Sequence, residues 1–331
     1  MNSSDNPINI LEVSNLKVYY EVNVKTGFFR STKHPLKAVD DVSFKLKAGE
    51  TLSIVGESGC GKSTLGRAIL GLTPAISGKI IYQNTNLLDL TGTEFRDIRK
   101  ELQIIFQDPL ASLNPRMTVG EIIAEPFQNF YPQLSKTIIK EKVKHIMSEV
   151  GLLGEHFNRY PHEFSGGQCQ RIGIARALIL KPKVLVCDEA VSALDVSVQA
   201  QIINLLKTLQ KKYELSLIFI AHDLSVVRYI SDKVLVMYLG KVVEMSDIRT
   251  IFNSPAHPYT QSLLSAVPVP DPEIERKKKI VLLKGELPSP LYPPIGCNFN
   301  TRCPKAFAKC FSVEPELKNL NNERDVSCHL Y

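Results

Sequence analysis

The sequence predicts an α/β protein in which a mostly parallel sheet carries a phosphate-binding loop. A glycine-rich segment, residues 56–64, follows an apolar run at 51–55 that predicts a buried strand and precedes a predicted helix at 65–71. Predicted strands and helices alternate again between residues 183 and 237. Ahead of the loop, residues 8–55 alternate apolar and polar side chains in short pieces, which predicts an antiparallel sheet.

The loop segment fits the spacing of a glycine, four residues and then Gly-Lys-Ser. Glycines let the backbone bend so that successive N–H groups point at an anion, and the following helix N-terminus favours phosphate. Lys62 is expected to reach the β- and γ-phosphates of a nucleotide, and the Ser63 hydroxyl to ligate Mg²⁺. The predicted nucleotide-binding residues here are Gly56, Ser58, Gly59, Cys60, Gly61, Lys62, Ser63 and Thr64. Taken alone, the segment could also be an ordinary glycine-rich turn.

Composition narrows the class of protein. The 331 residues are 44% hydrophobic, enough for one large core or two modest ones. No apolar run approaches the ~18–20 residues that span a bilayer, and the N-terminus lacks the features of a signal peptide. We therefore expect a cytosolic protein, or one attached to a membrane through other proteins. The net charge is +6, and the dense basic run at 276–279 predicts a solvated linker. The sequence has no tryptophan and no aromatic–basic repeat of the kind that RNA-binding modules show, so nucleic-acid binding is not expected.

Two stretches suggest how the loop is used. Gln107 follows the apolar run 102–106, where an amide could contact Mg²⁺ or the attacking water, although a polar strand end is the simpler interpretation. A second candidate anion site is the helix start formed by Ser165, Gly166, Gly167 and Gln168. Ser165 fits an N-cap, and the glycines leave the helix N-terminus open. Because one nucleotide already has its loop, this helix start is expected to cap the γ-phosphate bound by another subunit. An ordinary serine-capped helix is the alternative.

Acidic and basic groups follow two buried strands. Asp188 and Glu189 come directly after the apolar run 184–187, where Asp188 is expected to hold Mg²⁺ through water and Glu189 to act as base for the attacking water. Asp195, in a following turn, is expected to act across a dimer interface. His222 ends the next buried strand and could hydrogen-bond the γ-phosphate; a lone histidine would more often be structural.

These motifs, in this order, resemble the ATP-binding subunit of an ABC transporter over about residues 8–265. The resemblance assigns residues 56–64 to Walker A, 184–189 to Walker B, Gln107 to the Q-loop and His222 to the switch histidine. It assigns 165–168 to the signature and Asp195 to the D-loop. It implies a P-loop NTPase (RecA-like) fold with an antiparallel β subdomain and an inserted helical subdomain at about 108–165. It also makes Tyr20, or the adjacent Tyr19, the adenine-stacking aromatic. Ala190 stands where the family usually has proline, with little expected effect on chemistry.

The end of the chain resembles the importers of oligopeptides and dipeptides. The segments 257–264, 268–272 and 287–290 carry this resemblance, and 192–201 resembles the F-type of their two ATPase subunits. The predicted domains are thus an ATP-binding domain at 1–265 and an irregular extension at 266–331. Nine of the 20 prolines lie in the extension, which excludes long helices there. Importers of nickel and glutathione share much of this pattern, so they remain alternatives.

Four of the seven cysteines lie in the extension: Cys297, Cys303, Cys310 and Cys328. In a reducing compartment this clustering favours a metal over disulfides, and four thiolates can hold zinc or an iron–sulfur cluster. The resemblance implies a [4Fe–4S] cluster; zinc and no metal stay open.

The resemblance further implies a motor in which two related ATPase subunits sandwich two ATP molecules. Its implied partners are a second ABC ATPase, two integral membrane permease subunits and, through these, an extracytoplasmic peptide-binding protein. Its implied location is the cytoplasmic face of the inner membrane. A soluble ABC ATPase acting on nucleic acid or ribosomes, an accessory ATP-binding protein and a scaffold that binds ATP without turnover are the alternatives.

Overall fold

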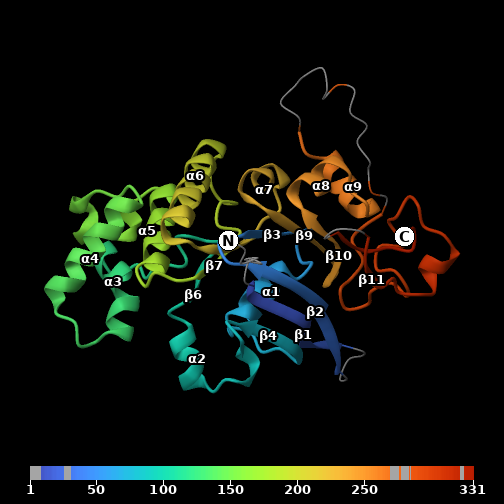
Figure 1. Ribbon diagram of the computed structural model, residues 1–331, viewed down its shortest axis with the longest axis horizontal. Coiled ribbons are helices and arrows are strands. Elements are labelled where there is room, and N and C mark those ends of the chain that lie inside the picture. The colour runs from blue at the N-terminus through green and yellow to red at the C-terminus, as the bar shows by residue number, and fades with distance from the viewer. Residues whose placement is uncertain (1–8, 26–30, 269–275, 277–282, 284, 321–323) are drawn as a thin grey trace, which may run out of the picture. The chain divides into compact units, whose positions relative to one another are not determined.

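The computed structural model describes residues 9–25, 31–268, 276, 283, 285–320 and 324–331. The chain divides into two compact units (Figure 1). Unit 1 comprises Met1–Lys47, Thr51–Asp89 and Ala221–Tyr331, and unit 2 comprises Ala48–Glu50 and Leu90–Ile220. The predicted basic linker at 276–279 lies, apart from Arg276, outside the described residues. Among the helices of the described residues, none has the length and apolar character needed to cross a membrane.

An antiparallel sheet opens unit 1, as the alternating pattern predicts. Its strands are β1 (Asn9–Lys25), β2 (Ser31–Lys47), β4 (Ser77–Tyr82) and β5 (Thr85–Asn86), in the order β2-β1-β4-β5. Leu11, Val13 and Val18 are at most 1% exposed, so one face of β1 lies in the core. Leu11 and Val13 follow the period of two that places alternate side chains on one side of a sheet, and irregularities in register between Val13 and Val18 shift the phase so that Val18 is buried as well.

The hairpin between β1 and β2 is longer than the sequence suggests. Residues 25–35 predict an exposed loop because of Gly27 and Pro35. That expectation is wrong for Lys25, which ends β1, and for 31–35, which belong to β2; residues 26–30 lie outside the described residues. Pro35 pairs with Glu21 of β1. Since β2 is the edge strand of this sheet, a proline that lacks an N–H costs no ladder hydrogen bond on its open side.

A second set of strands in unit 1 leads to the phosphate loop. In the order β11-β12-β10-β9-β3, these are β11 (Leu317–Asn319), β12 (Asp325–Ser327), β10 (Lys241–Asp247), β9 (Lys233–Tyr238) and β3 (Thr51–Val55). β3 and β9 are parallel, whereas β12 is antiparallel to β10, so the end of the chain joins this sheet. The helices of unit 1 are α1 (Lys62–Ile69), α7 (Leu224–Ile230), α8 (Ile248–Asn253) and α9 (Pro258–Ser265), with 3-10 turns at Leu87–Asp89 and Ala308–Phe311.

Unit 2 has three parallel strands and a group of helices. The strands, in the order β8-β7-β6, are β8 (Ser216–Ile220), β7 (Val184–Asp188) and β6 (Leu102–Ile105). The helices are α2 (Gly92–Ile98), α3 (Val119–Phe130), α4 (Lys136–Glu149), α5 (Gly166–Leu178) and α6 (Val196–Tyr213), with 3-10 turns at Gly154–Asn158 and Pro161–Glu163. All five residues of β7 and of β8 are buried, as expected for parallel strands covered on both faces.

The helices α3 and α4 begin where local chemistry favours a helix start. Thr118 and Glu121 form a reciprocal capping box at α3, and the Ser135 side chain accepts the backbone N–H of Ile138 at α4. Gly120 is required for packing, because a Cβ there would lie 2.5 Å from the ring of Phe157. The predicted helical region at 108–165 thus lies within unit 2, and its exact boundary stays a prediction.

Candidate functional site

The phosphate loop has the backbone conformation that only glycine adopts easily. Gly56, Gly59 and Gly61 have φ of 149°, 77° and 104°. A Cβ at Gly56 would lie 2.2 Å from the carbonyl oxygen of Met237, and one at Gly61 would lie 1.9 Å from that of Ala38. The loop is therefore wrapped tightly against β9 and β2, and no side chain fits at these two positions.

Lys62 lies inside this loop. It is 4% exposed, and its Nζ donates to the carbonyl oxygens of Gly56 at 2.9 Å and Glu57 at 3.0 Å. Gly61 caps α1 in the left-handed conformation without a side-chain hydrogen bond, so the helix N-terminus is not covered by a capping side chain. Burial raises the pKa of the Cys60 thiol, which keeps this neighbour of Lys62 neutral. A buried ammonium beside a helix N-terminus is suited to binding phosphate.

His222 lies at the same end of β3 as the loop. The N–H of the preceding Ala221 donates to the carbonyl oxygen of Ile54 at 3.2 Å, one residue before β3 ends. The following Asp223 caps α7 by accepting the N–H of Ser225 at 2.8 Å. The imidazole itself is exposed. Unit 1 therefore brings the loop and the predicted switch histidine to one edge of a sheet.

In unit 2 the predicted base and the predicted Q-loop glutamine are in contact. Ile105 and Cys187 are partners in the β6–β7 ladder, and two residues beyond each, Gln107 Nε2 donates to Glu189 Oε2 at 2.8 Å. Glu189 has a φ of 48°, an uncommon conformation for a residue with a side chain, and such strain gathers at functional sites.

Asp188 is 1% exposed at the end of β7. Burial, with the nearby Asp188 charge, raises the pKa of Cys187 to about 12, so that thiol stays neutral. The predicted Mg²⁺ ligands Ser63, Gln107 and Asp188 all offer oxygen, the donor that Mg²⁺ prefers, and this donor set therefore fits the ion.

The signature helix start packs closely on the start of α6. Ser165 and Gln168 form a reciprocal capping box at α5. A Cβ at Gly167 would lie 2.5 Å from Val198 Cγ1, and one at Gly166 would lie 3.5 Å from Leu194. Ser165, Gly166 and Asp195 are all exposed, and Val196 is 81% exposed. The predicted signature and D-loop residues thus lie next to each other on an exposed part of unit 2.

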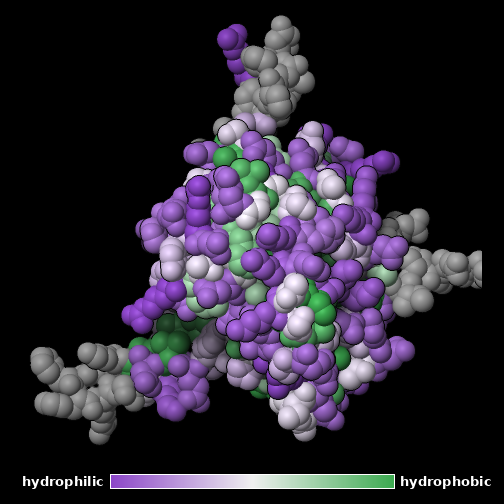
Figure 2. Space-filling view, turned by 90° about the vertical axis from the view of Figure 1, so that its left-hand side faces the viewer, coloured by the Kyte–Doolittle hydropathy of each residue, from purple (hydrophilic) through white to green (hydrophobic). Residues whose placement is uncertain are grey.

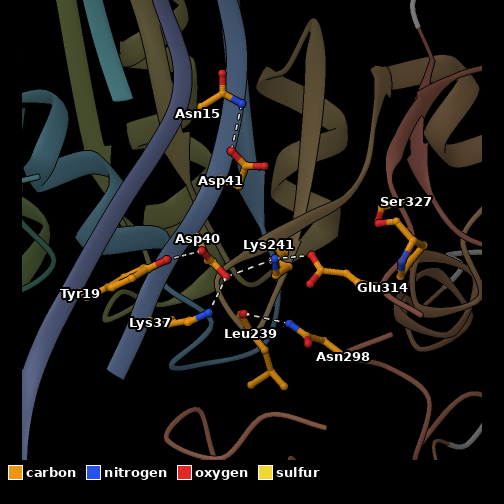
Figure 3. A network of polar contacts seen from close by, with 11 residues as sticks. Asn15, Tyr19, Lys37, Asp40, Asp41, Leu239, Lys241, Asn298, Glu314 and Ser327 are labelled. Atoms are coloured by element: carbon orange, nitrogen blue, oxygen red, sulfur yellow. Dashed lines mark hydrogen bonds and ion pairs between the residues drawn. The ribbon is translucent and has the colours of Figure 1, made fainter. Parts of the chain in front are cut away.

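The two candidate adenine-stacking tyrosines differ in their surroundings. The Tyr19 hydroxyl donates to Asp40 at 2.5 Å, in a network where Lys241 pairs with both Asp40 and Glu314 (Figure 3). Burial and the Asp40 carboxylate raise the pKa of Tyr19. Burial opposes the Asp40 charge, but the bond from Tyr19 and the Lys241 ammonium outweigh it and lower the Asp40 pKa. Tyr20, at 40% exposed, remains accessible to a base.

All seven cysteines are free thiols. Burial raises the pKa of Cys297 to about 11, and the other three extension thiols lie near enough to add to the shift. Within the part of the chain that the structure describes, no three His, Cys, Asp or Glu side chains are arranged to hold a metal ion. The extension thiols are thus near enough to influence one another, but the described side chains do not form a metal-binding arrangement.

The contact of the extension with the phosphate loop was not predicted from the sequence. Arg302 Nη1 lies 2.8 and 3.0 Å from the two carboxylate oxygens of Glu57, the second residue of the loop. A sequence separation of 245 residues carries no local pattern. The only signal was that Glu57 stands inside the motif and Arg302 beside Cys303.

These features define an ATP-binding cassette. Residues 39–192 match the ABC transporter family, and residues 243–310 match the C-terminal region of oligopeptide/dipeptide transporters. A dimeric post-hydrolysis structure of the ATP-binding cassette MJ0796 bound to ADP and Pi is similar with a TM-score of 0.63 and 27% identity, covering 72% of this chain and 99% of that one. The expected fold and ATP hydrolysis with ATP and Mg²⁺ are thereby confirmed.

Whole-length relatives narrow the family. The oligopeptide transport ATP-binding protein OppF of Salmonella typhimurium is 57% identical over 319 residues, which cover 96% of this chain and 95% of the relative. The dipeptide transport ATP-binding protein DppF of Escherichia coli is 49% identical, covering 96% of this chain and 93% of the relative. The chain belongs to the oligopeptide/dipeptide transporter family of ABC ATPases.

Proposed function

We propose that this chain is the ATP-hydrolysing motor subunit of an ABC importer that takes up oligopeptides or dipeptides. The observation that carries the proposal is the 57% identity to OppF over 96% of the chain, including the C-terminal extension. Nickel and glutathione importers, which the sequence left open, are not favoured by these relatives. The proposed location of the chain is the cytoplasmic face of the cell membrane, where it is bound through permease subunits.

The geometry supports a division of roles within the catalytic cycle. In unit 1, Lys62, the loop N–H groups and His222 are suited to binding the phosphates, and Tyr20 to stacking on adenine. In unit 2, Glu189 is suited to taking a proton from the attacking water, and its bond to Gln107 orients the carboxylate. When bound, Mg²⁺ neutralises the developing charge on the phosphates.

A second ATPase subunit is proposed to complete the site. The capping box of α5 engages the N–H of Gln168, and the exposed start of the helix still carries the N–H groups of Gly166 and Gly167, which are suited to capping a γ-phosphate held by a partner; Asp195 is exposed beside them. ATP would then close the dimer and hydrolysis reopen it. Gln107, which follows β6 in unit 2, is suited to passing this change to the helices.

Permease subunits are the proposed recipients of that motion. The side of the molecule that carries α3 and α4 is largely hydrophilic, with small apolar areas between the polar ones (Figure 2). Large apolar side chains of unit 2 that are exposed include Leu110, Ile138 and Leu153. Such a mixed surface suits a partner that stays bound while the motor opens and closes.

A [4Fe–4S] cluster on Cys297, Cys303, Cys310 and Cys328 is proposed for the extension, with zinc as the alternative. Because burial raises the pKa of Cys297, Cys303 and Cys328, ligation must release protons that the isolated thiols would keep. Iron, sulfide and zinc analysis of anaerobically purified protein, with its visible absorption, would decide between the two. Neither metal in stoichiometric amount would refute both.

The experiment for the main proposal is affinity purification of the chain from mildly solubilised membranes. The proposal expects two multi-span membrane proteins and a second ATPase to co-purify. Reconstituted into vesicles with a peptide-binding protein, the assembly should take up labelled peptide only with ATP. Recovery with ribosomes or metabolic enzymes alone would refute the transport role and leave the ATPase intact.

A further inference from the structure

Glu57, the second residue of the phosphate loop, is held at three of its polar groups. Its backbone N–H donates to the Tyr259 hydroxyl at 2.9 Å, and its carbonyl oxygen accepts Lys62 Nζ at 3.0 Å. Its carboxylate accepts Arg302 Nη1 through both oxygens, at 2.8 and 3.0 Å. The three partners come from α9, from the loop's own helix and from the cysteine-bearing extension. All of them lie in unit 1.

Arg302 has few other ways to satisfy its charge. Its side chain is 10% exposed, and its buried Nε has no hydrogen-bond partner among the described residues. The guanidinium lies over the Tyr238 ring, 6.0 Å from the centroid, and Nη1 lies 3.5 Å from the Tyr238 hydroxyl. Burial opposes the charge, but the bonds to Glu57 and Tyr238 outweigh it and raise the pKa of Arg302. Each charge of this pair therefore depends on the other.

The backbone that carries Arg302 is fixed by an aromatic cluster. Phe299 is 1% exposed and packs on Tyr238 and Tyr259 with ring centroids 5.2 and 5.4 Å away. Tyr238 and Tyr259 meet each other edge-on at 4.8 Å. The Arg302 N–H donates to the Phe299 carbonyl oxygen at 3.1 Å, which joins the arginine to this cluster in one turn. The extension is thus anchored against β9 and α9 at the point where the arginine reaches the loop.

We infer that Arg302 is a positioning residue for the phosphate loop, through which the extension sets the affinity for the nucleotide. Arg302 neutralises the Glu57 carboxylate and fixes its direction. Without the arginine, an uncompensated negative charge remains in the loop whose N–H groups and Lys62 must bind the phosphates of ATP, and like charges repel. The neighbouring Cys303 places this contact next to the cysteine cluster, so a change in the extension reaches the ATP site through one ion pair.

The test measures ATP affinity of the full chain by equilibrium titration, together with kcat and KM. Arg302→Gln is expected to weaken ATP binding roughly tenfold, about 1.4 kcal/mol, with kcat at saturating ATP changed far less. The double variant Glu57→Gln with Arg302→Gln removes both charges and should recover most of that loss. Arg302→Lys keeps the charge but loses the guanidinium that reaches both Glu57 oxygens and the Tyr238 hydroxyl through Nη1, so its ATP affinity should fall between those of the single and the double variant.

The matched control is Arg324→Gln. Arg324 also anchors the end of the chain, with Nη2 donating to the carbonyl oxygen and hydroxyl of Ser254 at 2.6 and 3.0 Å, but it contacts no loop residue in the described hydrogen bonds. It should leave ATP affinity unchanged. The inference is overturned if Arg302→Gln binds ATP normally, or if both variants weaken binding alike. If Arg302→Gln does not fold, Arg302→Lys against Arg324→Lys decides by the same criteria. None of these outcomes bears on the proposed function, because the parent chain's ATP hydrolysis and peptide uptake are tested separately.

Discussion

Gln107 Nε2 donates to Glu189 Oε2 at 2.8 Å, joining the end of β6 to the end of β7. The position of Glu189 is also set by its backbone, because its N–H donates to the Ile220 carbonyl oxygen at 3.1 Å and its φ is 48°. A carboxylate held in this way cannot turn freely. It presents Oε2 to the glutamine side chain.

Replacing Glu189 by Gln should abolish ATP turnover, by about 100-fold or more, because the proton acceptor is lost while shape is kept. ATP binding should persist, since the phosphates are held elsewhere. Phosphate release and nucleotide retention measure the two effects. The matched control is Glu214→Gln, an exposed glutamate of unit 2 with a similar φ of 53°. Unchanged phosphate release in Glu189→Gln would disprove the role of this residue as base.

Tyr20 and Tyr19 provide a paired test of adenine stacking. Tyr20→Ala should weaken ATP binding roughly tenfold, because stacking on an aromatic contributes about 1–3 kcal/mol per base. Tyr19→Phe keeps its ring and loses only the bond to Asp40, so it should leave ATP affinity unchanged and lower stability slightly. Equilibrium titration with ATP and with a triphosphate lacking the base separates base contacts from phosphate contacts. A larger effect for Tyr19→Phe would reverse the assignment.

Gly167 tests the close packing of the signature on α6. In Gly167→Ala the new Cβ meets Val198 Cγ1, and a valine in a helix has little freedom to turn away. The start of α5 should shift, lowering turnover while ATP binding to the loop persists. Val198→Ala in the same chain should restore activity. Gly173→Ala is the control: it lies in the same helix with nothing within 4 Å of its Cβ and should stabilise the chain by about 0.5–1 kcal/mol. Equal losses at 167 and 173 would contradict the packing argument.

The local motifs could be predicted because each follows from neighbouring residues. The consecutive residues 51–71 predict a strand, a glycine loop and a helix, and the structure has β3 and α1 there. The serine cap of α5 is likewise local. The apolar side chains at helical spacing over 138–153 predict a helix, and the structure has one at Lys136–Glu149, where the Ser135 cap sets its start.

The remaining features depend on contacts between distant residues. Residues 31–35 belong to β2 because they pair with β1, which overrides the turn signals of Gly27 and Pro35. β12 pairs with β10 at Val326 and Glu244, and a strand of three residues is too short to show a detectable alternating pattern. The bond between Arg302 and Glu57 belongs to the same class. No periodicity encodes it, and only the folded chain brings the two residues together.

His257 makes the acid stability of unit 1 predictable. It is 1% exposed, and burial lowers its pKa from 6.5 to about 3; its Nδ1 accepts the N–H of Tyr259 at 3.1 Å, which requires the neutral ring. The unfolded chain therefore binds a proton between pH 6.5 and 3 that the folded chain does not. Stability is full above the unfolded pKa and falls as the pH drops through this window, by about 2 kcal/mol from pH 7 to pH 5.

His257→Asn should flatten this dependence, because asparagine can also cap α9 but does not titrate. Urea unfolding followed by far-UV circular dichroism at pH 7, 6 and 5 measures it, since the chain has no tryptophan. The variant will be less stable at pH 7, where it leaves space beside Phe299, so the slopes with pH are compared rather than the absolute values. His162→Asn, at an exposed histidine, should keep the parent slope. Parallel slopes for the parent chain and His257→Asn would show that another group governs the loss, because the buried imidazole alone predicts the difference.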